Sequence, residues 1–149
     1  MARNRNIGSV ISGTILESDL IPAFVAELKY QRPLKRQHGK LVREVEARMY
    51  DDGYYDGNDS TDDLQELYDA LNEYAPAYFY FGGHPGDPAD CGYWLSESFI
   101  EDFDGLKVDD VCEVPRDYAG EVLHVNDHGN MTLYYRGRNR RLYEVWSIV

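Results

Sequence analysis

The period of the hydrophobic pattern changes once along this chain, at Pro76, and that change constrains the fold more than any other feature. Before Pro76 the apolar residues recur every three to four positions, as on one face of a helix. After it, short aromatic and β-branched runs alternate with turns rich in Gly, Pro and Asp, as in antiparallel strands. This order predicts an α+β fold in which N-terminal helices pack on a mostly antiparallel sheet of about five strands.

Three helices are predicted before Pro76: from residue 18 or 19 to before Pro33, over about 34–50, and from residue 60 or 61 to about 71. The remainder predicts a hairpin with a long loop, then a short helix, an irregular stretch and a three-stranded meander. The hairpin strands are predicted at 78–81 and 92–95, around a loop at 82–90. The short helix is predicted over 96–103 and the irregular stretch over 104–119. The meander strands are predicted at 121–125, 131–136 and 141–148.

A chain of 149 residues is expected to form one domain, 1–149, with a helical part over about 18–75 and a sheet part over about 77–149. Its thirteen Tyr, five Phe and two Trp supply enough apolar surface for a core. The two cysteines have no zinc-site spacing, and we expect no cofactor. No apolar run approaches the roughly 20 residues that span a bilayer, so a cytoplasmic protein is expected.

The formal net charge is −12, and the charge is unevenly distributed. Residues 29–48 hold seven of the fifteen basic side chains, and residues 136–141 hold four more. Residues 51–63 contain six Asp and no Lys or Arg, and residues 97–121 contain nine carboxylates against two basic residues. Such a field repels nucleic acid and anionic membranes and attracts basic protein surfaces. We therefore expect no direct nucleic-acid or membrane partner.

The leading hypothesis is a non-enzymatic acidic binding or inhibitor protein that occupies a basic surface of a nucleic-acid-handling protein, such as a host defence protein. It would act either as a DNA mimic or simply as an acidic match for a basic protein, and the sequence leaves this choice open. Tyrosines inside the first acidic stretch either add rigid contact area or fold back over the third predicted helix. The sequence leaves the oligomeric state open. The predicted contact residues are Asp51, Asp52, Tyr54, Tyr55, Asp56, Asp59, Asp62, Asp63, Glu101, Asp102, Asp104, Asp109 and Asp110.

Two alternatives belong to other classes. The loops that carry His84, Asp87 and Asp90 and then Asp127 and His128 supply ligands for a metal or a polar substrate, and so for an enzyme. The same residue types are also typical of tight turns. The second alternative is a toxin-neutralising immunity protein, which would use the same acidic surface.

Three segments carry a resemblance to a family. They are GSVISGTILESDLIPAF at 8–24, YFGGHPGDPADCGYW at 80–94 and GEVLHVNDHGNMTLY at 120–134. They resemble a group of small uncharacterised proteins of bacteria, phages and plasmids. The resemblance implies an origin on mobile genetic elements, where small acidic proteins often block a host or rival factor.

Overall fold

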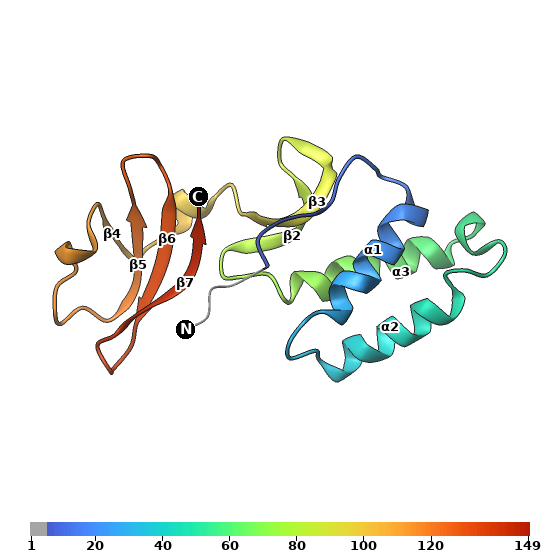
Figure 1. The fold of residues 1–149 in the computed structure, drawn as a ribbon, viewed down its shortest axis with the longest axis horizontal. Coiled ribbons are helices and arrows are strands. Elements are labelled where there is room, and N and C mark those ends of the chain that lie inside the picture. Colours follow the sequence, from blue (N-terminus) through green and yellow to red (C-terminus); the bar gives the residue numbers. More distant parts are fainter. Residues whose placement is uncertain (1–5) are drawn as a thin grey trace. The chain divides into compact units, whose positions relative to one another are not determined.

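The computed structural model describes residues 6–149, which belong to two compact units, 6–96 and 97–149 (Figure 1). The expectation of one domain over 1–149 stays a prediction. In the described residues, no helix has the length and apolar character needed to cross a membrane.

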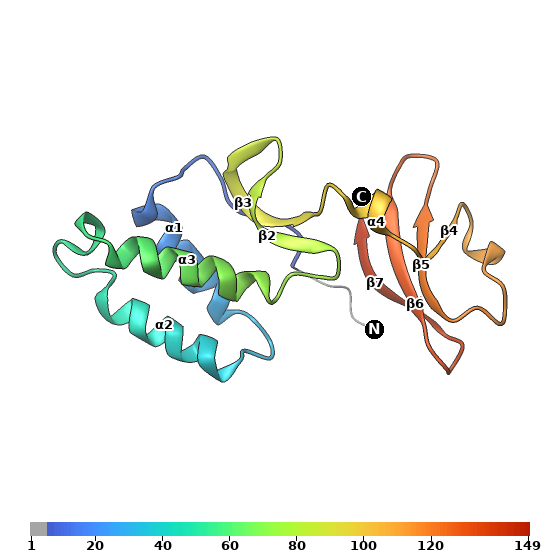
Figure 2. The same ribbon diagram turned by 180° about the vertical axis from the view of Figure 1, so that it is seen from behind.

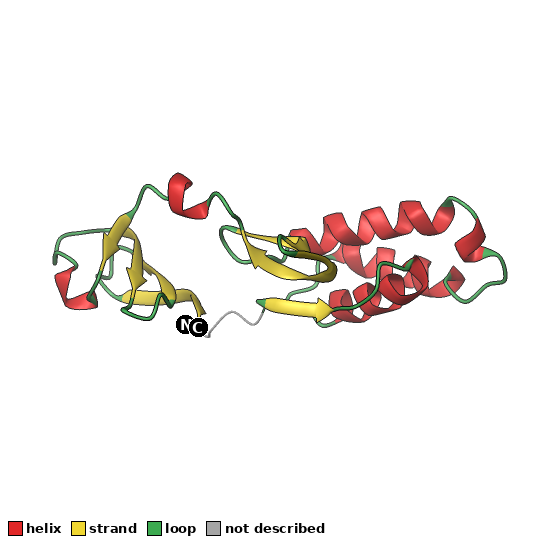
Figure 3. Cartoon of the chain, turned by 90° about the horizontal axis from the view of Figure 1, so that it is seen from above, coloured by secondary structure: helices red, strands yellow, loops and turns green. Residues whose placement is uncertain are grey.

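The unit 6–96 combines three helices with a three-stranded antiparallel sheet in the order β1-β3-β2 (Figure 3). Its elements are β1 (Gly8–Ile11), α1 (Glu17–Lys29), α2 (Arg36–Arg48), α3 (Asp59–Asn72), β2 (Phe79–His84) and β3 (Asp87–Leu95). The three predicted helices are confirmed, with ends that differ by one to three residues. A 3₁₀ turn at Tyr54–Asp56 leads into α3.

The core of this unit forms where α1 meets α2, α3 and one face of the sheet (Figure 2). The Phe24 ring lies edge-on to Tyr68 of α3 at 4.9 Å and to Phe81 of β2 at 5.1 Å between ring centroids. Phe81 pairs with Tyr93 across the two strands, so both rings face the helices. Each large side chain buried in this way contributes about 1.5–3 kcal/mol to stability.

The prediction of a long loop over 82–90 is wrong, because β2 and β3 extend through these residues to a tight turn at Pro85 and Gly86. The strand β1 was not predicted. It pairs with β3 at Gly92, where a Cβ would overlap the Gly8 carbonyl oxygen and lie 2.8 Å from the Ser9 Cα. Glycine stands here because another strand approaches closely, and no turn is involved.

The unit 97–149 contains a four-stranded sheet in the order β4-β5-β6-β7. Its elements are α4 (Phe99–Asp102), β4 (Leu106–Val108), β5 (Gly120–Val125), β6 (Met131–Arg136) and β7 (Leu142–Ile148). The meander β5-β6-β7 confirms the prediction, whereas β4, parallel to β5, lies in the stretch expected to be irregular. Each meander strand has a fully buried side chain: Val122 and Leu123 in β5, Leu133 in β6 and Trp146 in β7.

The α+β class is confirmed, and two details are corrected. The described residues contain seven strands in two sheets, whereas about five strands in one sheet were predicted. The helices are also not all N-terminal, because α4 follows the first sheet, and α4 confirms the short helix predicted over 96–103.

Candidate partner-binding site

The first acidic stretch, 51–63, connects α2 to α3 and folds around an interior ion pair. The Asp63 carboxylate accepts two hydrogen bonds from the Arg48 guanidinium, at 2.8 Å from Nε and 2.5 Å from Nη2. The Tyr54 hydroxyl donates a third, at 2.7 Å. Asp63 is 2% exposed and Tyr54 is 7% exposed. These two predicted contact residues are therefore part of the interior and do not contribute to a contact surface.

Burial and hydrogen bonding both act on this cluster. Burial on its own raises the pKa of the Asp63 carboxyl, but the hydrogen bonds from Arg48 and Tyr54 outweigh it and hold that pKa below its usual range. Burial, and then the hydrogen bond to Asp63, raises the pKa of Tyr54. Asp63 is therefore an anion at neutral pH, and Tyr54 is a neutral donor.

The other predicted residues of this stretch lie at the surface. Tyr55 is half-buried, with its ring edge-on to Tyr54 at 4.7 Å. The five remaining aspartates are exposed: Asp51, Asp52, Asp56, Asp59 and Asp62. Both hydroxyls at the start of α3 donate to the Glu17 carboxylate of α1, Ser60 at 2.5 Å and Thr61 at 2.8 Å. These bonds fix the start of α3 against α1.

An exposed row of carboxylates runs along α3, and we call it the acidic stripe: Asp59, Asp62, Glu66, Asp69 and Glu73. Its members follow one another at three or four residues, so they share one face of the helix. Sequence reasoning identified the first two and missed Glu66, Asp69 and Glu73. The helical spacing was the signal that could have found them.

The two ends of the acidic stripe differ. At the first end, Asp51, Asp52 and Asp59 line a shallow hollow of about 240 Å³ beside Arg48. At the far end, Glu73 forms an ion pair of 2.8 Å with Lys35, and its other carboxylate oxygen lies 2.7 Å from His38 Nε2. The hydrogen bond from Lys35 holds the pKa of Glu73 below its usual range. Of the stripe, only Glu73 forms an ion pair with a basic side chain of residues 6–149.

The second acidic stretch belongs to the unit 97–149, and all five of its predicted contact residues are exposed: Glu101, Asp102, Asp104, Asp109 and Asp110. Asp110 has a local structural role, since its carboxylate accepts a hydrogen bond of 2.8 Å from the Cys112 backbone N–H. That bond lowers the pKa of Asp110.

The side chains of the first predicted ligand loop make hydrogen bonds within the β2–β3 hairpin and to the neighbouring strand β1. His84 Nδ1 accepts from the Gly86 N–H at 2.9 Å, and its ring stacks edge-on to Trp94 at 4.6 Å. Asp87 accepts from the Ala89 N–H at 3.1 Å, and Asp90 accepts from the Ser9 hydroxyl.

The second predicted ligand loop lies in the unit 97–149. Asp127 and His128 occupy the exposed turn between β5 and β6, which the Asn126 side chain closes. Within residues 6–149, no three His, Cys, Asp or Glu side chains are grouped as a metal site requires.

No protein-family model, curated protein or solved structure matches this chain. The resemblance to proteins of bacteria, phages and plasmids stays a prediction, and function is inferred from the site itself.

Proposed function

We propose that this chain is a non-enzymatic binding protein whose acidic stripe occupies a basic surface of a nucleic-acid-handling protein. The observation that supports the proposal is the register of the stripe, in which four exposed carboxylates share one face of α3 and Glu73 follows at its C-cap. Four of them lack an ion-pair partner among the described basic side chains and are available to arginines and lysines of a partner: Asp59, Asp62, Glu66 and Asp69.

The spacing of these charges supports a surface that normally binds nucleic acid. From Asp59 to Glu73 the helix rises about 21 Å, at roughly 1.5 Å per residue. One strand of duplex DNA carries a phosphate per roughly 3.4 Å of axis, or about six over that length. The four unpaired carboxylates lie between Asp59 and Asp69, a rise of about 15 Å that holds about four such phosphates, whereas Glu73 is paired with Lys35. We infer that a cleft built for phosphates accepts these four carboxylates.

The fold supports a rigid contact. The Asp63–Arg48 pair ties α3 to α2, and the Ser60 and Thr61 bonds to Glu17 tie it to α1. A preorganised row of charges loses little conformational entropy on binding. The mobile-element origin implied by the family resemblance agrees with a host defence protein as the partner.

The test begins with a partner captured from an extract of the native host and then purified. We expect the captured protein to be basic, and duplex DNA to compete with this chain for it. Neutralising the four carboxylates (Asp59→Asn, Asp62→Asn, Glu66→Gln, Asp69→Asn) should weaken binding at low salt by about tenfold or more, since exposed ion pairs contribute about 0.2–1 kcal/mol each. The salt dependence of the affinity should also become shallower.

A matched control separates the stripe from net charge. The variant Glu97→Gln, Glu113→Gln, Asp117→Asn, Asp127→Asn removes the same charge from exposed positions in the unit 97–149. It should keep most of the affinity. Equal losses in the two variants would assign binding to overall charge, and simultaneous binding of DNA and this chain would contradict the proposal. A basic toxin as the captured partner would reassign the chain as an immunity protein.

A further inference from the structure

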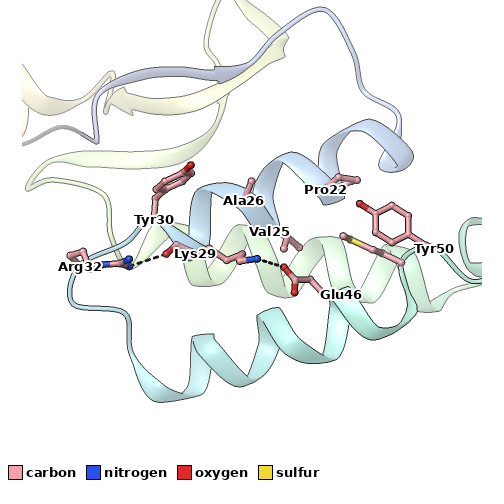
Figure 4. A pocket seen from close by; sticks show the side chains of 9 residues that line it. Pro22, Val25, Ala26, Lys29, Tyr30, Arg32, Glu46 and Tyr50 are labelled. Atoms are coloured by element: carbon pink, nitrogen blue, oxygen red, sulfur yellow. Dashed lines mark hydrogen bonds and ion pairs between the residues drawn. The ribbon is translucent and has the colours of Figure 1, made fainter.

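A second surface feature lies on the other side of α2 from the acidic stripe, a hollow of about 470 Å³ between α1 and α2. We call it the α1–α2 hollow. Its floor is apolar, because Val25 and Met49 are buried members of the core. A tyrosine lies at each end of the hollow (Figure 4). Tyr30 is 66% exposed and Tyr50 is 78% exposed.

The α1 side of the hollow is a continuous helical stripe. Pro22, Val25, Ala26 and Lys29 lie at spacings of three, four and seven residues, which place them on one face. From Pro22 to Tyr30 the helix rises about 12 Å, at roughly 1.5 Å per residue. A volume of this size lies within the roughly 300–1,000 Å³ of known ligand sites. The hollow therefore has room for a row of two or three side chains.

The charge around the α1–α2 hollow is positive, although the unit 6–96 as a whole is acidic. Across the middle, Lys29 neutralises Glu46 through an ion pair of 2.7 Å (Figure 4). Arg32 donates to the backbone carbonyls of Lys29 and Gln31, and no carboxylate of residues 6–149 lies within ion-pair distance of it. Its charge is therefore available to a ligand.

The α2 side adds two more positive charges. Arg43 lies about one helical turn before Glu46, which lines the hollow, and Arg36 lies about two turns before Arg43 on the same face of α2. Both are exposed. An apolar floor with aromatic ends and a basic surround is complementary to a ligand with apolar anchors and negative charge.

We propose that the α1–α2 hollow binds a short acidic amphipathic helix of a partner protein. A groove between two antiparallel helices accepts a third helix, which inserts side chains at i, i+3 or i+4, and i+7. Those anchors span about 10 Å, which matches the length of the α1 stripe. Acidic residues on the flanks of the bound helix lie near Arg32, Arg36 and Arg43. This site is separate from the acidic stripe and would take a partner of opposite charge.

The probe is a displayed library of random peptides about 16 residues long, enough for a helix to form on binding. Peptides are selected on the whole protein and then depleted on the variant Ala26→Glu. Ala26 is exposed and lines the hollow, so a glutamate there keeps the helix and places a negative charge where the peptide docks. We expect the remaining peptides to be rich in Asp and Glu, with apolar residues at helical spacing.

Labelled copies of the selected peptides then give affinities by fluorescence anisotropy. Ala26→Glu should weaken binding at least tenfold. The matched control Ala119→Glu makes the same change at an exposed position that does not line the hollow, and it should change affinity less than twofold. Tyr50→Ala, which removes an exposed ring, is a second variant that should weaken binding. The fourfold variant of the acidic stripe should bind as the wild type does, which makes this test independent of the proposed function.

Three outcomes would overturn the proposal. The first is that no selected peptide depends on Ala26. The second is that the dependent peptides are basic or lack helical spacing. The third is self-association in sedimentation that Ala26→Glu abolishes, because a second copy of this chain would then occupy the hollow.

Discussion

At the scale of single residues, the Asp63 carboxylate links protonation to stability. It is nearly fully buried and accepts hydrogen bonds from Arg48 and Tyr54, which hold its pKa below the usual range despite its burial. A carboxyl group whose pKa is depressed by folding contributes stability that is present above its unfolded pKa, about 3.9. That contribution is lost as the pH falls through the folded value.

The variant Asp63→Asn should lower the free energy of unfolding by about 2 kcal/mol at neutral pH. Removing one partner of a fully buried ion pair costs about 3–5 kcal/mol. Because the Arg48 side chain is 43% exposed, we expect a smaller cost here. The difference between variant and wild type should shrink below about pH 4, because protonation weakens the wild-type pair. Urea unfolding over a pH series measures it.

The neighbouring Asp62 provides the control. It lies in the same first turn of α3 but is exposed, so Asp62→Asn should change stability by less than about 0.5 kcal/mol. If the loss in unfolding free energy of Asp63→Asn stayed constant from neutral to acidic pH, this would contradict the view that Asp63 is ionised in its pair with Arg48.

At the scale of elements, the attachment of β1 depends on the missing side chain of Gly92. A methyl group there would overlap the Gly8 carbonyl oxygen, so Gly92→Ala should detach β1 and cost about 3 kcal/mol. Amide exchange at residues 9–11 should accelerate before exchange in α1 does. Hydrogen exchange followed by mass spectrometry resolves the two segments.

Gly57→Ala is the matched substitution, because nothing lies within 4 Å of its added Cβ and its φ is −112°. It should leave both stability and exchange nearly unchanged. Intact protection of β1 in Gly92→Ala would show that the strands separate enough to admit the methyl group.

The elements that were predicted correctly have strong local patterns. α1, α2 and α3 carry apolar residues at helical spacing, and β5, β6 and β7 are separated by turn residues. β1 and β4 have four and three residues, too few for a period to be recognised. Gly82 and Gly83 favoured a loop because glycine is common in turns. In the strand, a Cβ at Gly83 would lie 3.0 Å from the Pro88 carbonyl oxygen, a close approach that the local sequence does not reveal.

The candidate site was predicted in part. Asp59 and Asp62 belong to a visible acidic run, whereas Glu66 and Asp69 are found only by their spacing along a helix. That Asp63 and Tyr54 turn inward could not be predicted locally, since it depends on Arg48, fifteen residues before Asp63 and on another helix. The α1–α2 hollow likewise arises from the packing of two helices.

At the scale of the whole molecule, the unit 6–96 has a core of its own, formed by α1, α2, α3 and its sheet. Residues 6–96 expressed alone should therefore unfold cooperatively in urea with native-like helix content. The 53 residues of 97–149 make a much smaller core and should be marginal in isolation. Circular dichroism of the two segments measures both. An unfolded 6–96 segment would make 1–149 the smallest folding unit, as the single-domain prediction requires.

The pairing of β1 with β3 also sets an order of events during synthesis. Ser9 pairs with Gly92, so the ribosome must add 83 residues before the first strand meets its partner. At roughly 5–20 residues per second, that interval lasts about 4–17 seconds. The helices α1, α2 and α3 are complete earlier and need no distant residue to form. The nascent chain therefore carries β1 unpaired while α1, α2 and α3 form, and the pairing of β1 with β3 comes late in the folding of this unit.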